Sequence, residues 1–313
     1  MAGSSTVSGT YGGQAVIEGV MIRGPRHMAI AVRTPGGQIL TRGERLPEML
    51  AGPLRRVPLL RGMIVLYETL TLGVRALTWS SQVATGQDQR EISRAQLALS
   101  LVFTLAFVGV VFFAGPVLIT GWLGELTGNH WLEVVTECAL RVVMIIGYIW
   151  LVGRLPEVQR VFAYHAAEHR AIHAHEHGAA LRPDIVKQYP NEHARCGTAF
   201  MLTVGIVSLF AFVALGTPPL WIRLVERIIL IPAVASVAYE VLRAGQAYEG
   251  NRLIAALYRP NIWLQRLTTR DPDDEQIAVA ISALEHAMSL EPGAETAATP
   301  SPALATLPAE PGQ

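Results

Sequence analysis

Residues 97–120 read LALSLVFTLAFVGVVFFAGPVLIT and contain no charged side chain. A helix needs about 20 apolar residues, each adding about 1.5 Å of rise, to cross the hydrocarbon core of a bilayer. This stretch is long enough, and it lies inside a longer uncharged run between Arg94 and Glu125. The segment therefore predicts a transmembrane helix and places the chain among membrane proteins.

The composition supports the same class. Of the 313 residues, 51% are hydrophobic and 16% are charged, against roughly 25% charged residues in an ordinary soluble domain. The 25 basic and 25 acidic residues cancel, so no bulk charge attracts nucleic acid and we expect no nucleic-acid partner. Two cysteines, Cys138 and Cys196, are too few for a disulfide framework.

Three further apolar segments follow, at residues 132–152, 196–222 and 224–242. The first carries Glu137 and Arg141, whose i,i+4 spacing allows an ion pair that lowers the cost of burying both charges. The last carries Pro232 and Glu240. We therefore expect a mainly α-helical, polytopic membrane protein with about four transmembrane helices, in a domain of residues 94–243.

Basic residues are distributed unevenly around these segments. They are concentrated before residue 97, in the loop at 154–195 and after residue 242, whereas the two other loops are poor in Lys and Arg. The positive-inside rule assigns the side that is rich in these residues to the cytoplasm. We therefore expect a multi-pass protein of the plasma membrane, in contact with membrane lipid, with both termini and the loop at 154–195 in the cytoplasm.

Two elements are expected before the first span. In a cytoplasmic N-terminal segment of residues 1–56, stretches 28–34 and 38–43 flank Pro35-Gly36-Gly37 and predict a β-hairpin. Residues 57–80 predict an amphipathic helix that lies in the membrane interface or against the bundle. Its charged residues recur every seven positions and form one stripe: Arg61, Glu68 and Arg75.

Residues 244–290 form the cytoplasmic C-terminal segment. Asp271-Pro272-Asp273-Asp274-Glu275 is a strong helix start, with a capping residue, a proline and acids at the positive end of the dipole. The helix that follows is amphipathic, with one apolar face made of Ile277, Ile281, Leu284 and Met288. Residues 291–313 are rich in Pro, Ala and Thr and predict a disordered tail.

Histidines cluster in the loop at 154–195. Residues 156–177 contain no internal proline or glycine and predict a helix, in which His165, Glu168 and His169 form an H-x-x-E-H pattern. The i,i+4 spacing places both imidazoles on one face, as two ligands of one tetrahedral zinc ion require. Glu168 is then placed to accept a proton from a metal-bound water, and this residue order is that of inverzincin metallopeptidases.

The spacing leaves the rest of the ligand set open. His173 begins a second H-x-x-E-H pattern. It lies about 12 Å from His165 along a straight helix, so these two residues cannot bind the same ion together with His169. Either one of the two patterns binds a metal, or each forms a separate site. His193 and Cys196 form an H-x-x-C pair. Glu240, at the cytoplasmic end of its span, is the favoured distal ligand. The alternatives are a solvated histidine face, a buried structural thiol, and an ion pair of Glu240 with Arg243 or Arg195.

Several motifs resemble the bacterial YqhQ-like family, a domain-of-unknown-function family of multi-pass membrane proteins described as predicted metal-dependent enzymes. The motifs are YGGQAVIEGVMIRGP, YHAAEHRAIHAHE, HARCGTAF, VASVAYEVLR and LQRLTTRDPDDEQIAVAI, and they cover roughly residues 10–290. The resemblance implies a bacterial inner-membrane location and a metal role for the matching residues: Glu18, His165, Glu168, His169, His173, His193, Cys196 and Glu240. His175 and His177 lie outside the pattern. Glu18 either binds the backbone around it or orients a metal-bound imidazole.

These patterns predict a membrane enzyme that depends on a divalent metal, most simply Zn²⁺, and acts as a hydrolase at the cytoplasmic membrane boundary. A peptide or a lipid-linked substrate fits this chemistry equally, and a homo-oligomer is compatible with the sequence. A metal transporter or sensor is an alternative, although the uncharged span at 97–120 argues against a permeation path. A non-catalytic scaffold under the membrane is the third interpretation.

Overall fold

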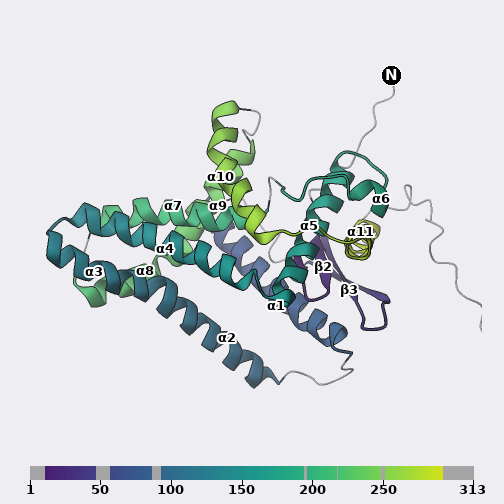
Figure 1. The fold of residues 1–313 in the computed structure, drawn as a ribbon, viewed down its shortest axis with the longest axis horizontal. Coiled ribbons are helices and arrows are strands. Elements are labelled where there is room, and N and C mark those ends of the chain that lie inside the picture. Colours follow the sequence, from purple (N-terminus) through teal and green to yellow (C-terminus); the bar gives the residue numbers. More distant parts are fainter. Residues whose placement is uncertain are drawn as a thin grey trace, which may run out of the picture.

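The structure is a computed structural model that describes residues 11–46, 57–86, 93–193, 196–216, 218–247 and 251–291. It is mainly helical, with one four-stranded antiparallel sheet near the N-terminus. The sheet and the histidine-bearing helix lie at one end of the molecule, and long apolar helices extend to the other end (Figure 1). Apart from Glu291, the predicted tail at 291–313 lies outside the described residues.

The sheet is formed by β1 (Gly12–Val16), β2 (Gly19–Arg23), β3 (His27–Arg33) and β4 (Ile39–Arg45), which pair in sequence order. The predicted hairpin is confirmed as β3 and β4. The sequence pattern does not predict β1 and β2. These strands are joined by the two-residue turn Ile17-Glu18, in which Glu18 has a φ of 52°, a conformation uncommon for a residue that is not glycine.

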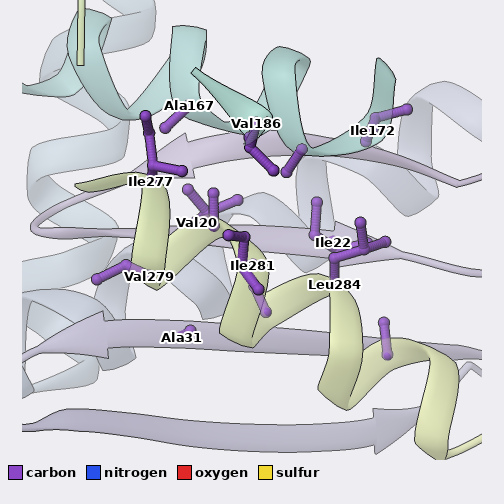
Figure 2. Packing of buried hydrophobic residues seen from close by; sticks show 14 of the residues in the cluster. Val20, Ile22, Ala31, Ala167, Ile172, Val186, Ile277, Val279, Ile281 and Leu284 are labelled. Carbon is purple, nitrogen blue, oxygen red and sulfur yellow. The ribbon is translucent and has the colours of Figure 1, made fainter. Parts of the chain in front are cut away.

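Helices cover both faces of the sheet. Because side chains alternate along a strand, Val20 and Ile22 point to one face and Met21 points to the other. The first face packs against α5 (Pro156–Glu176), α6 (Pro183–Val186) and α11 (Asp274–Ser289), as Figure 2 shows. The second face packs against α1 (Leu60–Ala84). Strands β2 and β3 are therefore buried on both sides.

Helix α11 begins where the acidic cluster predicts. Asp273 caps it: Oδ1 accepts from the backbone N–H of Gln276 at 2.7 Å, and the Gln276 side chain accepts from the backbone N–H of Asp273 at 3.0 Å. Its apolar face, including Ile277 and Leu284, lies on the sheet (Figure 2). Burying each of these two side chains stabilises the fold by about 1.5–3 kcal/mol, and this holds α11 beside the histidine-bearing helix.

Two of the three charged residues of the α1 stripe, Arg61 and Glu68, face the protein, whereas Arg75 is exposed. Glu68 is buried and accepts two hydrogen bonds of 2.9 Å from Arg23 of β2. Arg61 pairs with Glu240 of α9 (Ile231–Ala247). The opposite side of α1 exposes large apolar residues such as Tyr67 and Leu70. Helix α1 therefore lies against the rest of the molecule through apolar contacts with the sheet and through the ion pairs of Arg61 and Glu68. This position is one of the two placements that the sequence predicts.

Two helices among the described residues are long and apolar enough to cross a membrane. The first, Ala98–Thr127, combines α2 (Arg94–Val108), the π-helical segment η3 (Gly109–Ala114) and α3 (Gly115–Thr127). The second, Trp131–Val152, belongs to α4 (His130–Val152). Only 17% and 28% of the residues in their most apolar windows are buried, whereas the core helix of a soluble protein would be mostly buried.

The other two predicted spans are not found as single long helices in the part of the chain that the structure describes. Helix α7 (Thr198–Leu215) is apolar but short. The expected span at 224–242 is divided between α8 (Leu220–Ile229) and α9, which starts one residue before Pro232. Proline lacks the N–H that would continue the helical ladder, which gives a physical reason for the break.

Charged side chains of α4 and α8 are buried against each other. Glu137 is 0% exposed and accepts hydrogen bonds from Arg141 at 2.9 Å and from Arg227 at 3.2 Å. One turn away, Glu133 pairs with Arg223. The predicted i,i+4 pair of Glu137 and Arg141 is thus confirmed, and α8 supplies two further arginines that help to compensate the buried acids.

Candidate metal centre

The first histidine pair of α5 lies beside the start of α7. The ring centroids of His165 and His169 are 4.4 Å apart. Cys196, two residues before α7, places its Sγ 3.2 Å from Nε2 of His165. One ligand atom from each of these three residues lies within 4.8 Å of the others. Two imidazoles and a thiol therefore converge on one region.

The geometry of this group fits a zinc ion. Zinc binds imidazole nitrogen at about 2.0–2.1 Å and thiolate sulfur at about 2.3 Å, so neighbouring ligand atoms in a tetrahedral site lie roughly 3.3–3.7 Å apart. The distance of 3.2 Å between His165 Nε2 and Cys196 Sγ is close to that edge length. A site with three protein ligands keeps its fourth position for water or substrate.

Backbone carbonyls orient both imidazoles. Nδ1 of His165 lies 2.9 Å from the carbonyl oxygen of Thr268, at the end of α10 (Arg252–Thr268). Nδ1 of His169 lies 2.5 Å from the carbonyl oxygen of Asn191. If each Nδ1–H donates to its carbonyl, Nε2 carries the lone pair that a metal needs. The side chain of Asn191 is itself held by Arg170 at 2.7 Å and by Asp271 at 2.9 Å.

Burial controls the protonation of these ligands. The His169 side chain is 2% exposed, and desolvation, reinforced by the neighbouring His165, lowers its pKa to about 2. His169 is therefore a neutral imidazole, the form that binds metals. Burial raises the pKa of the Cys196 thiol, whose Sγ lies 3.2 Å from the Thr198 hydroxyl. A bound cation would favour the thiolate instead, because coordination deprotonates a thiol.

Glu168 lies between this group and the sheet. It is 3% exposed, and its Oε2 is 3.5 Å from Nε2 of His169. Desolvation raises the pKa of Glu168 to about 8, and a backbone hydrogen bond from Gly13 opposes the rise. Glu168, His169 and Cys196 line a cavity of about 30 Å³, which is large enough for a water molecule or an ion.

The packing around β1 explains why residue 13 is a glycine. A Cβ atom at this position would lie 2.5 Å from the carbonyl oxygen of Met21 and 2.9 Å from both Cγ and Oε1 of Glu168. A Cβ at Gly12 would meet no atom within 4 Å. Strand β1 therefore approaches α5 closely at Gly13 because that residue has no side chain, and its backbone helps to hold the Glu168 carboxyl group in the cavity.

A second group of ligand-type side chains adjoins the first. His173, Glu176 and His193 each have one ligand atom within 4.8 Å of the others. Nε2 of His193 lies 3.3 Å from Oε2 of Glu176, and the rings of His173 and His193 are 4.4 Å apart. The rings of His169 and His193 are 5.8 Å apart, so the two groups are neighbours.

Comparisons with known proteins give the family. A family model described as "Protein of unknown function (DUF1385)" matches residues 57–290. The chain belongs to the DUF1385 family. The "Uncharacterized protein YqhQ" of Bacillus subtilis (strain 168) is 32% identical over 305 residues, which cover 93% of this chain and 96% of that protein. No solved structure matches the chain. The family expected from the sequence motifs is confirmed, whereas the metal and the reaction remain proposals.

Two of the expected site residues lie elsewhere in this DUF1385 protein. Glu240 is hydrogen-bonded to Arg61 and to the backbone N–H of Leu59. It is not in either ligand group, which corrects its assignment as the distal ligand. Glu18 pairs with Arg160 and accepts a hydrogen bond of 3.3 Å from Tyr164. It therefore attaches the β1–β2 turn to α5 and does not orient an imidazole.

The predicted H-x-x-C pair is divided between the two groups: Cys196 joins His165 and His169, and His193 joins His173. His175 and His177 belong to neither group among the described residues. His175 packs edge-on against Tyr11 with ring centroids 5.2 Å apart, and His177 contacts the carbonyl oxygen of His173 at 2.8 Å.

Several residues of this DUF1385 site were not predicted. The carbonyls of Asn191 and Thr268 and the backbone of Gly13 act through main-chain atoms, which leave no mark in the sequence. Gln265 fixes the backbone of His193, accepting from its N–H at 2.9 Å and donating to its carbonyl at 3.0 Å. Glu176 did carry a signal, since it lies three residues after His173 on the same helical face.

Proposed function

We propose that this protein is an integral membrane, metal-dependent hydrolase whose divalent cation, most simply Zn²⁺, is bound by His165, His169 and Cys196. The observation that carries the proposal is the convergence of these three ligand atoms within 4.8 Å of one another. A buried carboxyl group adjoins them, because Oε2 of Glu168 lies 3.5 Å from Nε2 of His169. Nucleophile generation by a metal requires such a combination of ligands and a proton acceptor.

Each side chain has a distinct task in this proposal. When bound, a zinc ion polarises substrate oxygens and lowers the pKa of its water to about 7. Glu168 accepts a proton from water in the cavity and returns it to the leaving group. In the metal-free protein desolvation raises its pKa to about 8, which favours the protonated form. A cation bound beside it would favour the ionised form that accepts the proton. The carbonyls of Thr268 and Asn191 keep the two imidazoles in position.

The chain path supports a site close to the membrane boundary. Helix α5 starts at Pro156, shortly after α4 ends at Val152. His165 is nine residues further along α5, which corresponds to about 14 Å at the rise of an α-helix. Cys196 lies two residues before the apolar helix α7. We place this boundary on the cytoplasmic side, with both termini in the cytoplasm, on the distribution of basic residues.

The substrate must bring its reacting group into a small space. The cavity measures about 30 Å³, which is room for a water molecule or an ion, so the scissile group would have to approach it from outside and the rest of the substrate would stay beyond it. A substrate held at the membrane surface meets this requirement. We therefore expect activity toward membrane-associated rather than freely diffusing molecules.

The test uses the full-length protein, purified in detergent and reconstituted in vesicles. Hydrolysis of ester, phosphoester and peptide probes anchored in the same vesicles is measured with the metal content of each sample. His169→Ala should lose both metal and hydrolysis, whereas Glu168→Gln should keep the metal and lose hydrolysis. His177→Ala, an exposed histidine of the same region, is the matched control and should keep both. Full metal occupancy in His169→Ala, or full hydrolysis in Glu168→Gln, would contradict the proposal.

A further inference from the structure

We infer that His173, Glu176 and His193 form a second divalent-cation site, so that two cations adjoin one cavity. The inference deepens the proposed function and rests on it for the first cation. The second group has a complete donor set of two imidazoles and one carboxylate, with one ligand atom of each residue within 4.8 Å of the others. Such a set suits zinc and related transition metals.

The two histidines of the second group are held in place by the fold, whereas Glu176 is exposed at the end of α5. His193 is only 6% exposed, and its backbone is bonded on both sides by the side chain of Gln265, which is 0% exposed. The ring of His173 is oriented by the carbonyl oxygen of Glu192, 2.9 Å from Nε2. Metal-ligating histidines typically have a backbone carbonyl as the partner of one ring nitrogen.

The second group reaches the cavity of the first through His193. Along His165, His169, His193 and His173, successive ring centroids are 4.4, 5.8 and 4.4 Å apart. His169 and Cys196 of the first group and His193 of the second all line the cavity that also contains the Glu168 carboxyl group. Hydrolases with two adjacent cations use them to hold both the attacking and the leaving oxygen. In this protein His193 is the residue that would connect the second cation to the cavity of the first.

The two sites differ in donor chemistry and in access. The first contains a thiol, Cys196, whereas the second contains the carboxylate of Glu176, so thiophilic ions favour the first. Glu176 lies at the exposed end of α5, while His165 and His169 lie deeper in the helix. We therefore expect the second cation to be removed first by a chelator.

Cobalt binding to the full-length, metal-free protein in detergent tests the inference. Total bound Co²⁺ is measured by mass spectrometry, and the sulfur-to-cobalt charge-transfer absorption reports the cation at Cys196 alone. We expect two equivalents of Co²⁺, of which one produces this absorption. His173→Ala and Glu176→Gln should each reduce binding to one equivalent without changing the absorption. Cys196→Ser should abolish the absorption and retain the second equivalent, and the control His177→Ala should bind two.

The outcomes separate this inference from the proposed function. The second site would be overturned, and the first retained, if the unmodified protein bound one equivalent of Co²⁺ with the sulfur absorption and His173→Ala bound the same amount. If the unmodified protein bound one equivalent of Co²⁺ without the sulfur absorption, and His173→Ala lost it, the result would support the second site and contradict the proposed ligand set of His165, His169 and Cys196. No bound cobalt in a protein with an unchanged circular dichroism spectrum would overturn both.

Discussion

Replacing Glu168 by glutamine should stabilise the metal-free protein, and the gain should increase with pH. Desolvation raises the pKa of Glu168 to about 8 from a reference value of 4.5. A carboxyl group whose pKa is raised by folding keeps its proton in the folded state while the unfolded chain loses it. The free energy of unfolding therefore decreases as pH rises from about 4.5 to about 8. Glutamine has a similar shape and does not titrate, so this decrease should be absent in Glu168→Gln.

The magnitude follows from the size of the pKa shift. Each pKa unit corresponds to about 1.4 kcal/mol, so the penalty from Glu168 is about 3 kcal/mol at pH 7 and nearly 5 kcal/mol by pH 9. Below pH 4 the carboxyl group is protonated in both states and the penalty disappears. For a chain of this size, about 3 kcal/mol corresponds to a difference of roughly 6–12 °C in the unfolding midpoint.

The assay is thermal unfolding in detergent with a chelator present, followed by circular dichroism between pH 4 and pH 9. Glu168→Gln should match the unmodified protein at pH 4 and unfold at a higher temperature from pH 7 upward. Glu157→Gln, in the exposed first turn of the same helix, is the control and should show no such trend. An equal midpoint for Glu168→Gln and the unmodified protein at all pH values would refute the buried, protonated state of Glu168.

Two further variants test the packing around the site and between the apolar helices. Gly13→Ala should lower the free energy of unfolding by about 1–3 kcal/mol through overpacking and should weaken zinc binding, because the added Cβ would meet Met21 and Glu168. The control Gly12→Ala should match the unmodified protein in both thermal unfolding and zinc titration. Glu137→Ala should lower the free energy of unfolding by about 3–5 kcal/mol, because it leaves the buried Arg141 and Arg227 without the carboxylate that they share. Glu125 is exposed, so the control Glu125→Ala should leave the unfolding midpoint unchanged. Equal midpoints for Glu137→Ala and Glu125→Ala would count against a stabilising role of the buried Glu137 ion pairs.

Local sequence signals predict local elements well in this protein. The uncharged run at 97–120, the acidic start of α11 and the Pro35-Gly36-Gly37 turn each correspond to an observed element, because capping, turn and hydrophobicity rules act over a few residues. The i,i+4 spacing of His165 and His169 likewise agrees with their ring separation of 4.4 Å. The start of α5 at Pro156 follows the rule that proline is tolerated in the first helical turn.

Features that depend on tertiary contacts were not predictable in this way. Strands β1 and β2 contain several glycines and are stabilised by helices from distant parts of the chain. His193 and Cys196 join different ligand groups although the backbone N–H of Cys196 donates to the carbonyl of His193 at 3.2 Å, and the H-x-x-C spacing alone does not predict this division. Glu240 is bonded to Arg61, 179 positions away in the sequence, a partner that the local pattern gave no reason to choose over Arg243 or Arg195.

X-ray absorption at the zinc edge of the purified, full-length protein tests the central claim most directly. We expect bound zinc with one sulfur ligand per chain at about 2.3 Å and nitrogen or oxygen ligands at about 2.0 Å. The sulfur contribution should be absent in Cys196→Ser and unchanged in Cys138→Ser. A protein that binds no zinc, or zinc whose coordination contains no sulfur, would contradict a metal centre at His165, His169 and Cys196.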